Sequence, residues 1–152
     1  MDQMVATFSI IEGLLWSDGT PVTADDSVYS YEVASNNATP VSKFLIDRTQ
    51  TYEAADERTV QWWGMPGYID PDYYTNFWMP LPTHAWEQYS AAELLQAEAS
   101  SKLPLGWGAY IIKEWKAGES IHLVKNLNYF RADSDLPKFD ELTFIIKTDA
   151  NA

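Results

Sequence analysis

Cysteine is absent from this 152-residue sequence, and positive charge is scarce. Without thiols the chain can form neither a disulfide framework nor a thiolate metal site. Ten basic residues stand against 22 acidic ones, which gives a formal net charge of −12 at pH 7. Such a chain repels polyphosphate and has no counterion-release route to nucleic acid. The composition therefore predicts that neither nucleic acid nor an anionic membrane is a partner.

Long hydrophobic runs are also missing. The longest, such as Phe144–Ile146, fall far short of the roughly 20 residues that a helix needs to span a bilayer. The opening MDQMVATFSII has no basic segment followed by an apolar stretch, so it does not resemble a signal peptide. With 46% hydrophobic residues, the chain is long enough to bury one core. We therefore expect a single domain over residues 1–152, either kept inside the cell or cut from a longer protein.

The first part of the chain is typical of a strand, a turn and a helix. Residues 5–11 carry valine, threonine, phenylalanine and isoleucine in rough alternation, which favours a strand. In the turn WSDGT, Gly19 can take a positive φ without a Cβ clash. A helix is expected over residues 24–34, with a narrow apolar stripe that includes Val28 and Tyr31.

Two acidic residues begin that predicted helix. Thr23 followed by Asp26 resembles a capping box, with aspartate in place of the usual glutamate or glutamine. Asp25 and Asp26 also lie favourably at the positive end of the helix dipole. Because a cap already accounts for both carboxylates, we interpret them as structural rather than catalytic.

Two hairpins are predicted further along the chain. The first has strands at residues 51–54 and 59–63. The second has strands at residues 109–115 and 120–125, around a turn that contains Gly118. A last strand is expected in the stretch FDELTFIIKT near the end of the sequence.

Helices are expected between the two hairpins. Asp70 could cap a short helix over residues 72–78, with Pro71 at its first position. Thr83 could cap a further helix, and residues 91–100 have high helix propensity. Because strands and helices do not alternate regularly, their order predicts an α+β fold with a mixed or antiparallel sheet and a few short helices.

Motifs for catalysis or metal binding are scarce. His84 and His122 are far apart in sequence, and no cysteine or carboxylate stands at ligand spacing from His122. The DPD and DSD triplets lack the glycine and the distant glutamate of a calcium loop, so we interpret them as turns. No G-x-S-x-G, P-loop or dinucleotide-binding motif is present. The sequence therefore predicts no catalytic residue, no metal site and no cofactor, and it does not indicate an enzyme.

Aromatic residues, in contrast, are abundant, with 7 Trp, 9 Tyr and 6 Phe. Most would serve packing, but aromatic rings also form stacking surfaces for a peptide or a sugar, because they offer a large contact area with few rotors. Trp107 is the best candidate for such a role. It lies between Gly106 and Gly108 in a loop that leads into a predicted strand, so we expect its ring to be presented rather than buried.

Several stretches, taken together, resemble a known family. They are FSIIEGLLWSDGTPVTADDSVYSYEVA, YEAADERTVQW, PLPTHAW, PLGWGAYIIKEWKAGESIHLVKNLNYF and LPKFDELTFIIKTDANA. In this order they resemble the extracellular solute-binding proteins of family 5, the peptide, oligopeptide and nickel receptors of ABC importers. The family pattern has a proline where this chain has Ala109, and a tryptophan where it has Phe130.

The resemblance implies both an architecture and a role. Residues 1–152 would be an excised fragment of the first lobe of a periplasmic-binding-protein type II-like receptor. Its partners would be a peptide or similar small solute, the remaining lobe of the receptor and an ABC permease in the membrane. The location would be periplasmic or extracellular and membrane-associated. Ligand contacts in the interlobe cleft would come from Gly106, Trp107, Gly108 and Tyr110.

Two other hypotheses stay open at this point. A free-standing aromatic carbohydrate-binding module would explain the tryptophans, and it predicts that the isolated chain binds sugar. A glycosidase would need two carboxylates roughly 5–9.5 Å apart in a cleft. Neither hypothesis explains why the family motifs occur in order along the chain.

Overall fold

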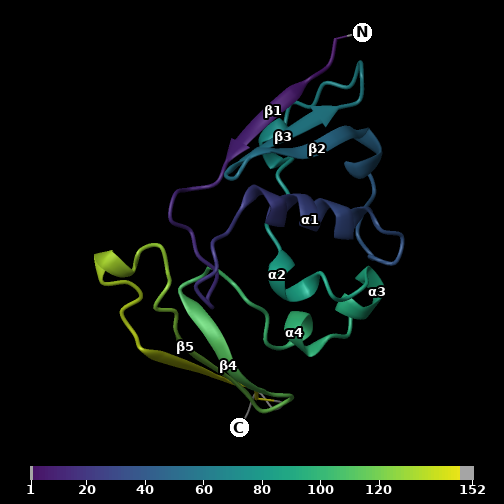
Figure 1. The fold of residues 1–152 in the computed structure, drawn as a ribbon. Coiled ribbons are helices and arrows are strands. Elements are labelled where there is room, and N and C mark those ends of the chain that lie inside the picture. Colours follow the sequence, from purple (N-terminus) through teal and green to yellow (C-terminus); the bar gives the residue numbers. More distant parts are fainter. Residues whose placement is uncertain (1, 148–152) are drawn as a thin grey trace. The chain divides into compact units, whose positions relative to one another are not determined.

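The computed structural model describes residues 2–147, which divide into two compact units. Unit 1 is formed by the residues up to 12 and by residues 22–95, and unit 2 by residues 13–21 and those from 96 onward. Each unit contains one three-stranded antiparallel sheet, and short helices complete an α+β fold (Figure 1). The predicted fold class is therefore confirmed, with two small sheets. No helix within residues 2–147 combines the length and apolar character needed to cross a membrane.

The sheet of unit 1 has the strand order β1–β3–β2, formed by β1 (Val5–Ser9), β2 (Thr49–Asp56) and β3 (Thr59–Gly64). Strands β2 and β3 are the predicted first hairpin, and together they extend beyond the predicted residues at both ends. Strand β1 ends at Ser9, two residues earlier than the alternation indicated.

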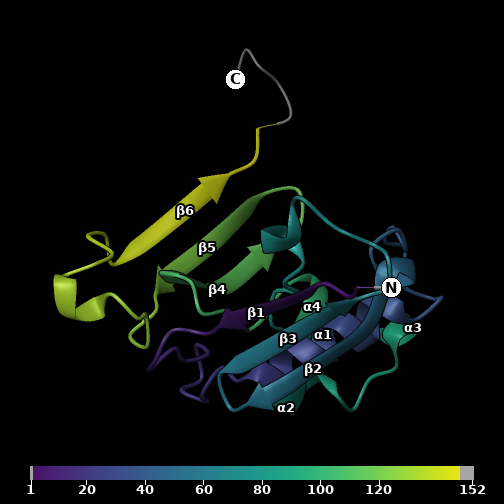
Figure 2. The same cartoon turned by 90° about the horizontal axis from the view of Figure 1, so that it is seen from above.

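Helix α1 (Ala24–Ser35) covers one face of this sheet (Figure 2). Ala24 is fully buried, and Val28 and Tyr31 pack against the same hydrophobic core. The apolar stripe predicted for this helix is therefore confirmed. The sheet supplies the other side of the core through Ala6, Tyr52, Val60 and Trp62.

Trp62 lies at the centre of the core, with none of its surface exposed. Its indole N–H donates a hydrogen bond to Thr49 Oγ1 at 2.8 Å, so the one polar atom of the buried ring is satisfied. Gly64 leaves room for the ring: a Cβ atom at Gly64 would lie only 2.7 Å from Trp62 Cη2. Trp62 is thus a large, fully buried ring in the core of unit 1.

Asp26 ties the start of α1 to a distant segment of unit 1. Its Oδ2 accepts a hydrogen bond from the Thr23 N–H at 3.1 Å, which confirms the predicted capping role. Its Oδ1 accepts a second one from the Thr83 N–H, also at 3.1 Å, which the sequence did not predict. Because the carboxylate is buried and serves two backbone groups, Asp26 is structural.

The prediction of a helix over residues 72–78 is wrong. Only a 3₁₀ turn forms there, at Tyr73–Thr75. Asp70, the expected cap, instead accepts hydrogen bonds from the Asp72 N–H at 3.0 Å, the Asn76 side-chain amide at 3.0 Å and the Tyr68 hydroxyl at 3.1 Å. These three bonds fold the segment around the carboxylate and leave no straight stretch for a helix. The bond from Asn76 is the main reason why the pKa of Asp70 lies below its ordinary value.

We expect the substitution Asp70→Asn to lower the free energy of unfolding by about 2 kcal/mol at neutral pH, since it removes a charged acceptor of three hydrogen bonds. A carboxylate with a lowered folded-state pKa stabilises the fold above its unfolded pKa of about 3.9, and that contribution is lost as the pH falls through the folded value. The difference between the parent chain and the variant should therefore shrink below about pH 4. Urea unfolding of both proteins at neutral and acid pH measures it.

Asp72→Asn is the matched control for this experiment, because the Asp72 carboxylate is exposed and, among the described residues, accepts only the Tyr74 hydroxyl, at 3.2 Å. We expect this variant to be close to the parent chain at every pH. A stability difference for Asp70→Asn that stays constant from neutral to acid pH would contradict the assigned role of the charge.

In place of the one or two helices expected from Thr83 to Ser100, the structure has three short ones: α2 (Thr83–Trp86), α3 (Ala91–Leu94) and α4 (Glu98–Ser101). Thr83 is the first helical residue and not the cap, which is Pro82. The break before α3 has a local cause, since Ser90 Oγ accepts the Glu93 N–H at 3.3 Å and so starts a new helix.

The sheet of unit 2 has the order β4–β5–β6, formed by β4 (Tyr110–Lys116), β5 (Ser120–Lys125) and β6 (Glu141–Ile145). Figure 2 shows the three strands side by side. Gly118 takes a φ of +79° in the turn between β4 and β5, a conformation that glycine adopts without strain. The second predicted hairpin and the last predicted strand are confirmed.

Candidate functional site

The four residues predicted to contact a ligand lie in unit 2, in a loop that runs into β4. Gly108 is exposed, whereas Gly106, Trp107 and Tyr110 are half-buried. The structure thus places all four in one continuous segment with accessible surface. We define this segment, residues 106–110, as the glycine–tryptophan loop.

Trp107 is less open than the sequence indicated. Its ring meets Trp16 edge-on, with ring centroids 5.0 Å apart and an interplanar angle of 66°. Trp16 itself is only 1% exposed, so it forms a fixed support for the loop. The sequence predicted a ring that is presented rather than buried; the structure has it half-buried, in contact with Trp16 on one side.

Asn126 holds the backbone of the glycine–tryptophan loop. Its side-chain amide donates to the Gly108 carbonyl at 2.8 Å, and its backbone N–H donates to the Ala109 carbonyl at 2.9 Å. The side-chain oxygen accepts the Asn128 N–H at 2.9 Å. Asn126 itself is fully buried, whereas Gly108 is exposed, so these bonds connect the loop to the interior of unit 2. Sequence reasoning did not select this residue, although its position directly after β5 would have been a signal.

A second segment of unit 2, the turn after Trp16, is connected to the asparagines beside the glycine–tryptophan loop through Asn128. The Asn128 side-chain amide donates to the Ser17 carbonyl at 3.0 Å. Ser17 belongs to the predicted turn after Trp16, which the structure confirms: Gly19 has a φ of +91°, and its N–H donates to the Trp16 carbonyl at 2.9 Å. The turn and the glycine–tryptophan loop are therefore linked by the two asparagines and by the paired tryptophans.

Tyr110, the first residue of β4, is fixed at both ends. Its backbone pairs with Lys125 on β5, and its hydroxyl donates to the Phe139 carbonyl at 3.0 Å. Lys125 in turn forms an ion pair with Asp140 at 2.9 Å, and the hydrogen bond to Asp140 raises the pKa of the Lys125 ammonium group. The hydroxyl of Tyr110 is thus occupied, which leaves its ring as the group that a ligand could contact.

Neither histidine lies in the glycine–tryptophan loop. His84 is in α2, and His122 is in β5, where its Nε2 lies 3.2 Å from Glu141 Oε2. Within residues 2–147 no three histidine, aspartate or glutamate side chains gather in a way that could hold a metal ion. What the loop offers chemically is aromatic surface and rigidly held backbone, which can bind a solute by stacking and hydrogen bonding.

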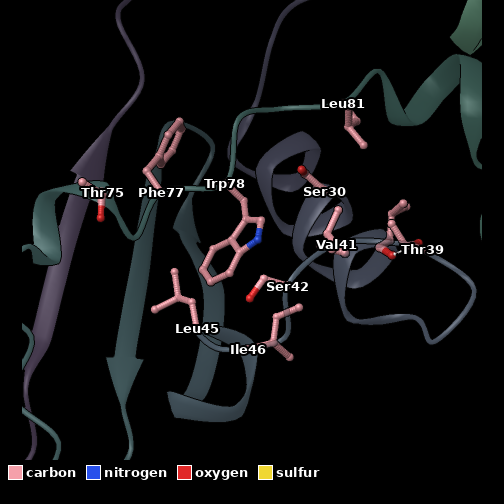
Figure 3. Close-up of a pocket in the computed structure, with 12 residues that line it drawn as sticks. Ser30, Thr39, Val41, Ser42, Leu45, Ile46, Thr75, Phe77, Trp78 and Leu81 are labelled. Carbon is pink, nitrogen blue, oxygen red and sulfur yellow. Dashed lines mark hydrogen bonds between the residues drawn. The ribbon is translucent and has the colours of Figure 1, made fainter.

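A concave feature in unit 1 was not predicted. It is a hollow of about 410 Å³ centred on Trp78, between α1, residues 39–46 and residues 75–81 (Figure 3). None of the side chains that line it is charged. Sequence reasoning missed this hollow because its lining comes from three separate stretches of the chain.

Comparison with known proteins gives a consistent result. Residues 1–152 match the family model described as "Bacterial extracellular solute-binding proteins, family 5 Middle". The oligopeptide-binding protein AppA of Bacillus subtilis is 33% identical over 153 residues, which cover 94% of this chain and 26% of that protein. The periplasmic oligopeptide-binding protein OppA of Salmonella typhimurium is 27% identical over 163 residues, or 95% of this chain and 29% of that protein.

Solved structures show the same likeness. AppA of Bacillus subtilis in complex with a nonapeptide superposes with a TM-score of 0.81 at 28% identity, over 97% of this chain and 29% of that one. A mannohexaose-bound oligopeptide-binding protein of Thermotoga maritima gives a TM-score of 0.78 at 25% identity, over 97% and 27%. The chain thus spans about a quarter of the length of the relatives that it matches.

Proposed function

Because the chain belongs to the bacterial extracellular solute-binding proteins of family 5, we propose that it is part of the substrate-binding component of an ABC-type importer. The observation that carries this proposal is the family match, which extends over all 152 residues. The two relatives described above are both named as oligopeptide-binding proteins. A peptide is therefore the first solute class to test, and no chemical step is assigned to the chain.

In this proposal residues 1–152 form a fragment of the first lobe and supply one wall of an interlobe cleft. The remaining lobe of the same receptor would supply the other wall, and the closed form would dock on the permease in the membrane. Solute binding would shift the population between open and closed forms, because only the closed form contacts the solute from both sides. The full receptor would act in the periplasm or outside the cell.

The residues proposed to contact the solute are Gly106, Trp107, Gly108 and Tyr110. Two features support this choice. The loop backbone is held by Asn126, so little ordering is needed on binding. The Trp107 and Tyr110 rings are fixed at one side and half-exposed, as expected for a stacking surface.

We expect Trp107→Ala to weaken solute binding by at least about tenfold, since rigid aromatic anchors dominate the binding energy of such surfaces. The experiment titrates the longer protein that contains this chain, with and without the substitution, against a peptide and oligosaccharide library, and follows tryptophan fluorescence. Trp115→Ala is the matched control, because Trp115 is 39% exposed on β4 outside the glycine–tryptophan loop.

Two results would count against the proposal. Unchanged affinity in Trp107→Ala would remove the loop from the binding site. Tight binding of an oligosaccharide by the 152-residue chain alone would instead favour a free-standing carbohydrate-binding module.

A further inference from the structure

The hollow in unit 1 has an uncharged lining, although 21% of the residues in the chain are charged. An uncharged, mostly apolar surface penalises a charged occupant, because no partner offsets the loss of its hydration. The volume of about 410 Å³ falls within the range of roughly 300–1,000 Å³ that is usual for small-molecule sites. Its dimensions and charge therefore fit a small neutral molecule.

The centre of the hollow is a rigid aromatic ring. Trp78 meets Tyr31 and Tyr52 edge-on, with both pairs of ring centroids 4.8 Å apart. The Trp78 backbone N–H also donates to the Tyr52 hydroxyl at 3.1 Å. A ring fixed in this way offers a preformed stacking surface, and binding to it costs little side-chain entropy.

The wall opposite α1 is fixed as well. The ammonium group of Lys43 donates to the carbonyl groups of Ala34, Asn36 at 2.7 Å and Thr39 at 3.3 Å, and so joins the end of α1 to the next segment. The Thr39 hydroxyl donates to the Val33 carbonyl. The hollow is therefore built into the fold and does not depend on an unsupported loop.

Two polar groups in this hollow are uncommitted. Ser30 is 9% exposed, and its hydroxyl has no hydrogen-bond partner within residues 2–147. The indole N–H of Trp78 likewise has none in that part of the chain. In Figure 3 the indole nitrogen lies on the edge of the ring toward Ser30 and Val41. A hydroxyl group on an occupant could accept from the indole N–H and also bond to Ser30.

The other hydroxyl groups of the lining are already bonded. Thr75 Oγ1 donates to the Asp72 carbonyl at 2.9 Å, and Ser42 Oγ accepts the Phe44 N–H at 3.3 Å. A peptide segment would bring several backbone groups that need partners, whereas few polar groups of the lining are uncommitted in the part of the chain that the structure describes. A single small molecule with one polar group matches the uncommitted hydrogen-bonding groups of the hollow better.

We propose that the hollow around Trp78 is a binding site for a small neutral aromatic molecule with one hydroxyl group, of the phenol type. The aromatic ring stacks against Trp78, and the hydroxyl group bonds to Ser30 and the indole N–H. This site lies in unit 1, apart from the glycine–tryptophan loop of unit 2, and it does not depend on the function proposed above.

The test uses the ¹⁵N-labelled 152-residue chain and 4-methylphenol as the probe. In ¹H–¹⁵N spectra we expect the Trp78 indole resonance and the Ser30 amide to shift on titration, while the other indole resonances stay in place. Toluene, which lacks the hydroxyl group, should bind at least about threefold more weakly. The anion 4-hydroxybenzoate should bind more weakly still, because its charge finds no partner.

Variants localise the effect. Ser30→Ala should weaken binding of 4-methylphenol about three- to tenfold, since it removes one hydrogen bond. Ala34→Leu should abolish it, because the larger side chain fills the hollow. Ser35→Ala is the matched control on the same helix: Ser35 donates to the Tyr31 carbonyl at 2.7 Å and does not line the hollow.

Several results would overturn the proposal. One is an unmoved Trp78 indole resonance at saturating 4-methylphenol, and another is unchanged affinity in both Ser30→Ala and Ala34→Leu when their spectra show a retained fold. Equal binding of toluene would remove the role of the hydroxyl group. Tighter binding of N-acetyltyrosinamide than of 4-methylphenol would assign the site to a tyrosine side chain of a peptide instead.

Discussion

Replacing Trp62 with alanine is expected to lower the free energy of unfolding by about 3–5 kcal/mol. The ring is completely buried in the unit 1 core, and it packs so closely over Gly64 that a Cβ atom there would lie only 2.7 Å from it. Its loss leaves a large cavity and removes the hydrogen bond from the indole N–H to Thr49 Oγ1, which keeps its bond to the Leu45 carbonyl at 2.8 Å. Because whole domains are stable by only about 5–15 kcal/mol, the variant should be partly unfolded at 37 °C.

The neighbouring residue provides the control. Trp63 lies on the opposite face of β3, and its indole N–H is buried with no partner within residues 2–147. Trp63→Phe keeps the aromatic ring and removes an unsatisfied donor, so its effect should stay below about 1 kcal/mol. Urea unfolding, followed by circular dichroism and by amide exchange at Val60, compares the two variants. A loss of under about 1 kcal/mol in Trp62→Ala would show that the core does not centre on this ring.

The second large effect is expected at Asn126. Its replacement by alanine should destabilise unit 2 by about 2 kcal/mol, because the Gly108 carbonyl and the Asn128 N–H both lose their partner and the fully buried Asn126 side chain is removed. The same change should free the glycine–tryptophan loop, so that solute affinity falls along with stability. Amide hydrogen exchange at Asn128, whose N–H loses its acceptor, and at Tyr110, whose backbone pairs with Lys125, should rise by about two orders of magnitude.

Two variants calibrate this result. Asn128→Ala removes a single bond, to the Ser17 carbonyl, and should cost about 1 kcal/mol. Asn37→Ala changes an exposed asparagine of unit 1 and should have no measurable effect. If exchange at Asn128 and Tyr110 were the same in Asn126→Ala and the parent chain, the loop would not depend on the asparagine.

The strands could be predicted from the sequence because their signals are local. The alternation in residues 59–63 and the glycine at position 118 each specify a hairpin over a few residues. The helices between the hairpins could not, because their limits depend on side-chain to backbone bonds. Alanine-rich sequence favoured one helix through residues 91–100, but Ser90 caps a new start and the helix ends at Leu94. Helix propensity alone cannot specify such a break.

The candidate site was predictable only in part. The glycines around Trp107 marked the loop, and the family resemblance supported that choice. The contacts that hold the loop were not visible, because Trp16 and Asn126 are distant in sequence and meet it only in the folded unit. The hollow around Trp78 was missed for the same reason. The Ser30 hydroxyl can be recognised as a possible ligand contact only once the fold brings residues from two other segments next to it.

The discontinuous composition of unit 2 sets an order of events during synthesis. Residues 13–21 leave the ribosome early, yet the partner of Ser17 is Asn128, and that hydrogen bond spans 111 positions. Unit 1 is complete once residue 95 has emerged, so it can fold while the rest of unit 2 is still being made. Once unit 1 has folded, residues 12 and 22 are fixed at the two ends of the segment 13–21. The loop that later closes between Ser17 and Asn128 is then effectively shorter. Because the chain is made from its N-terminus, unit 1 can fold first, and residues 13–21 join unit 2 only after Asn128 has been synthesised.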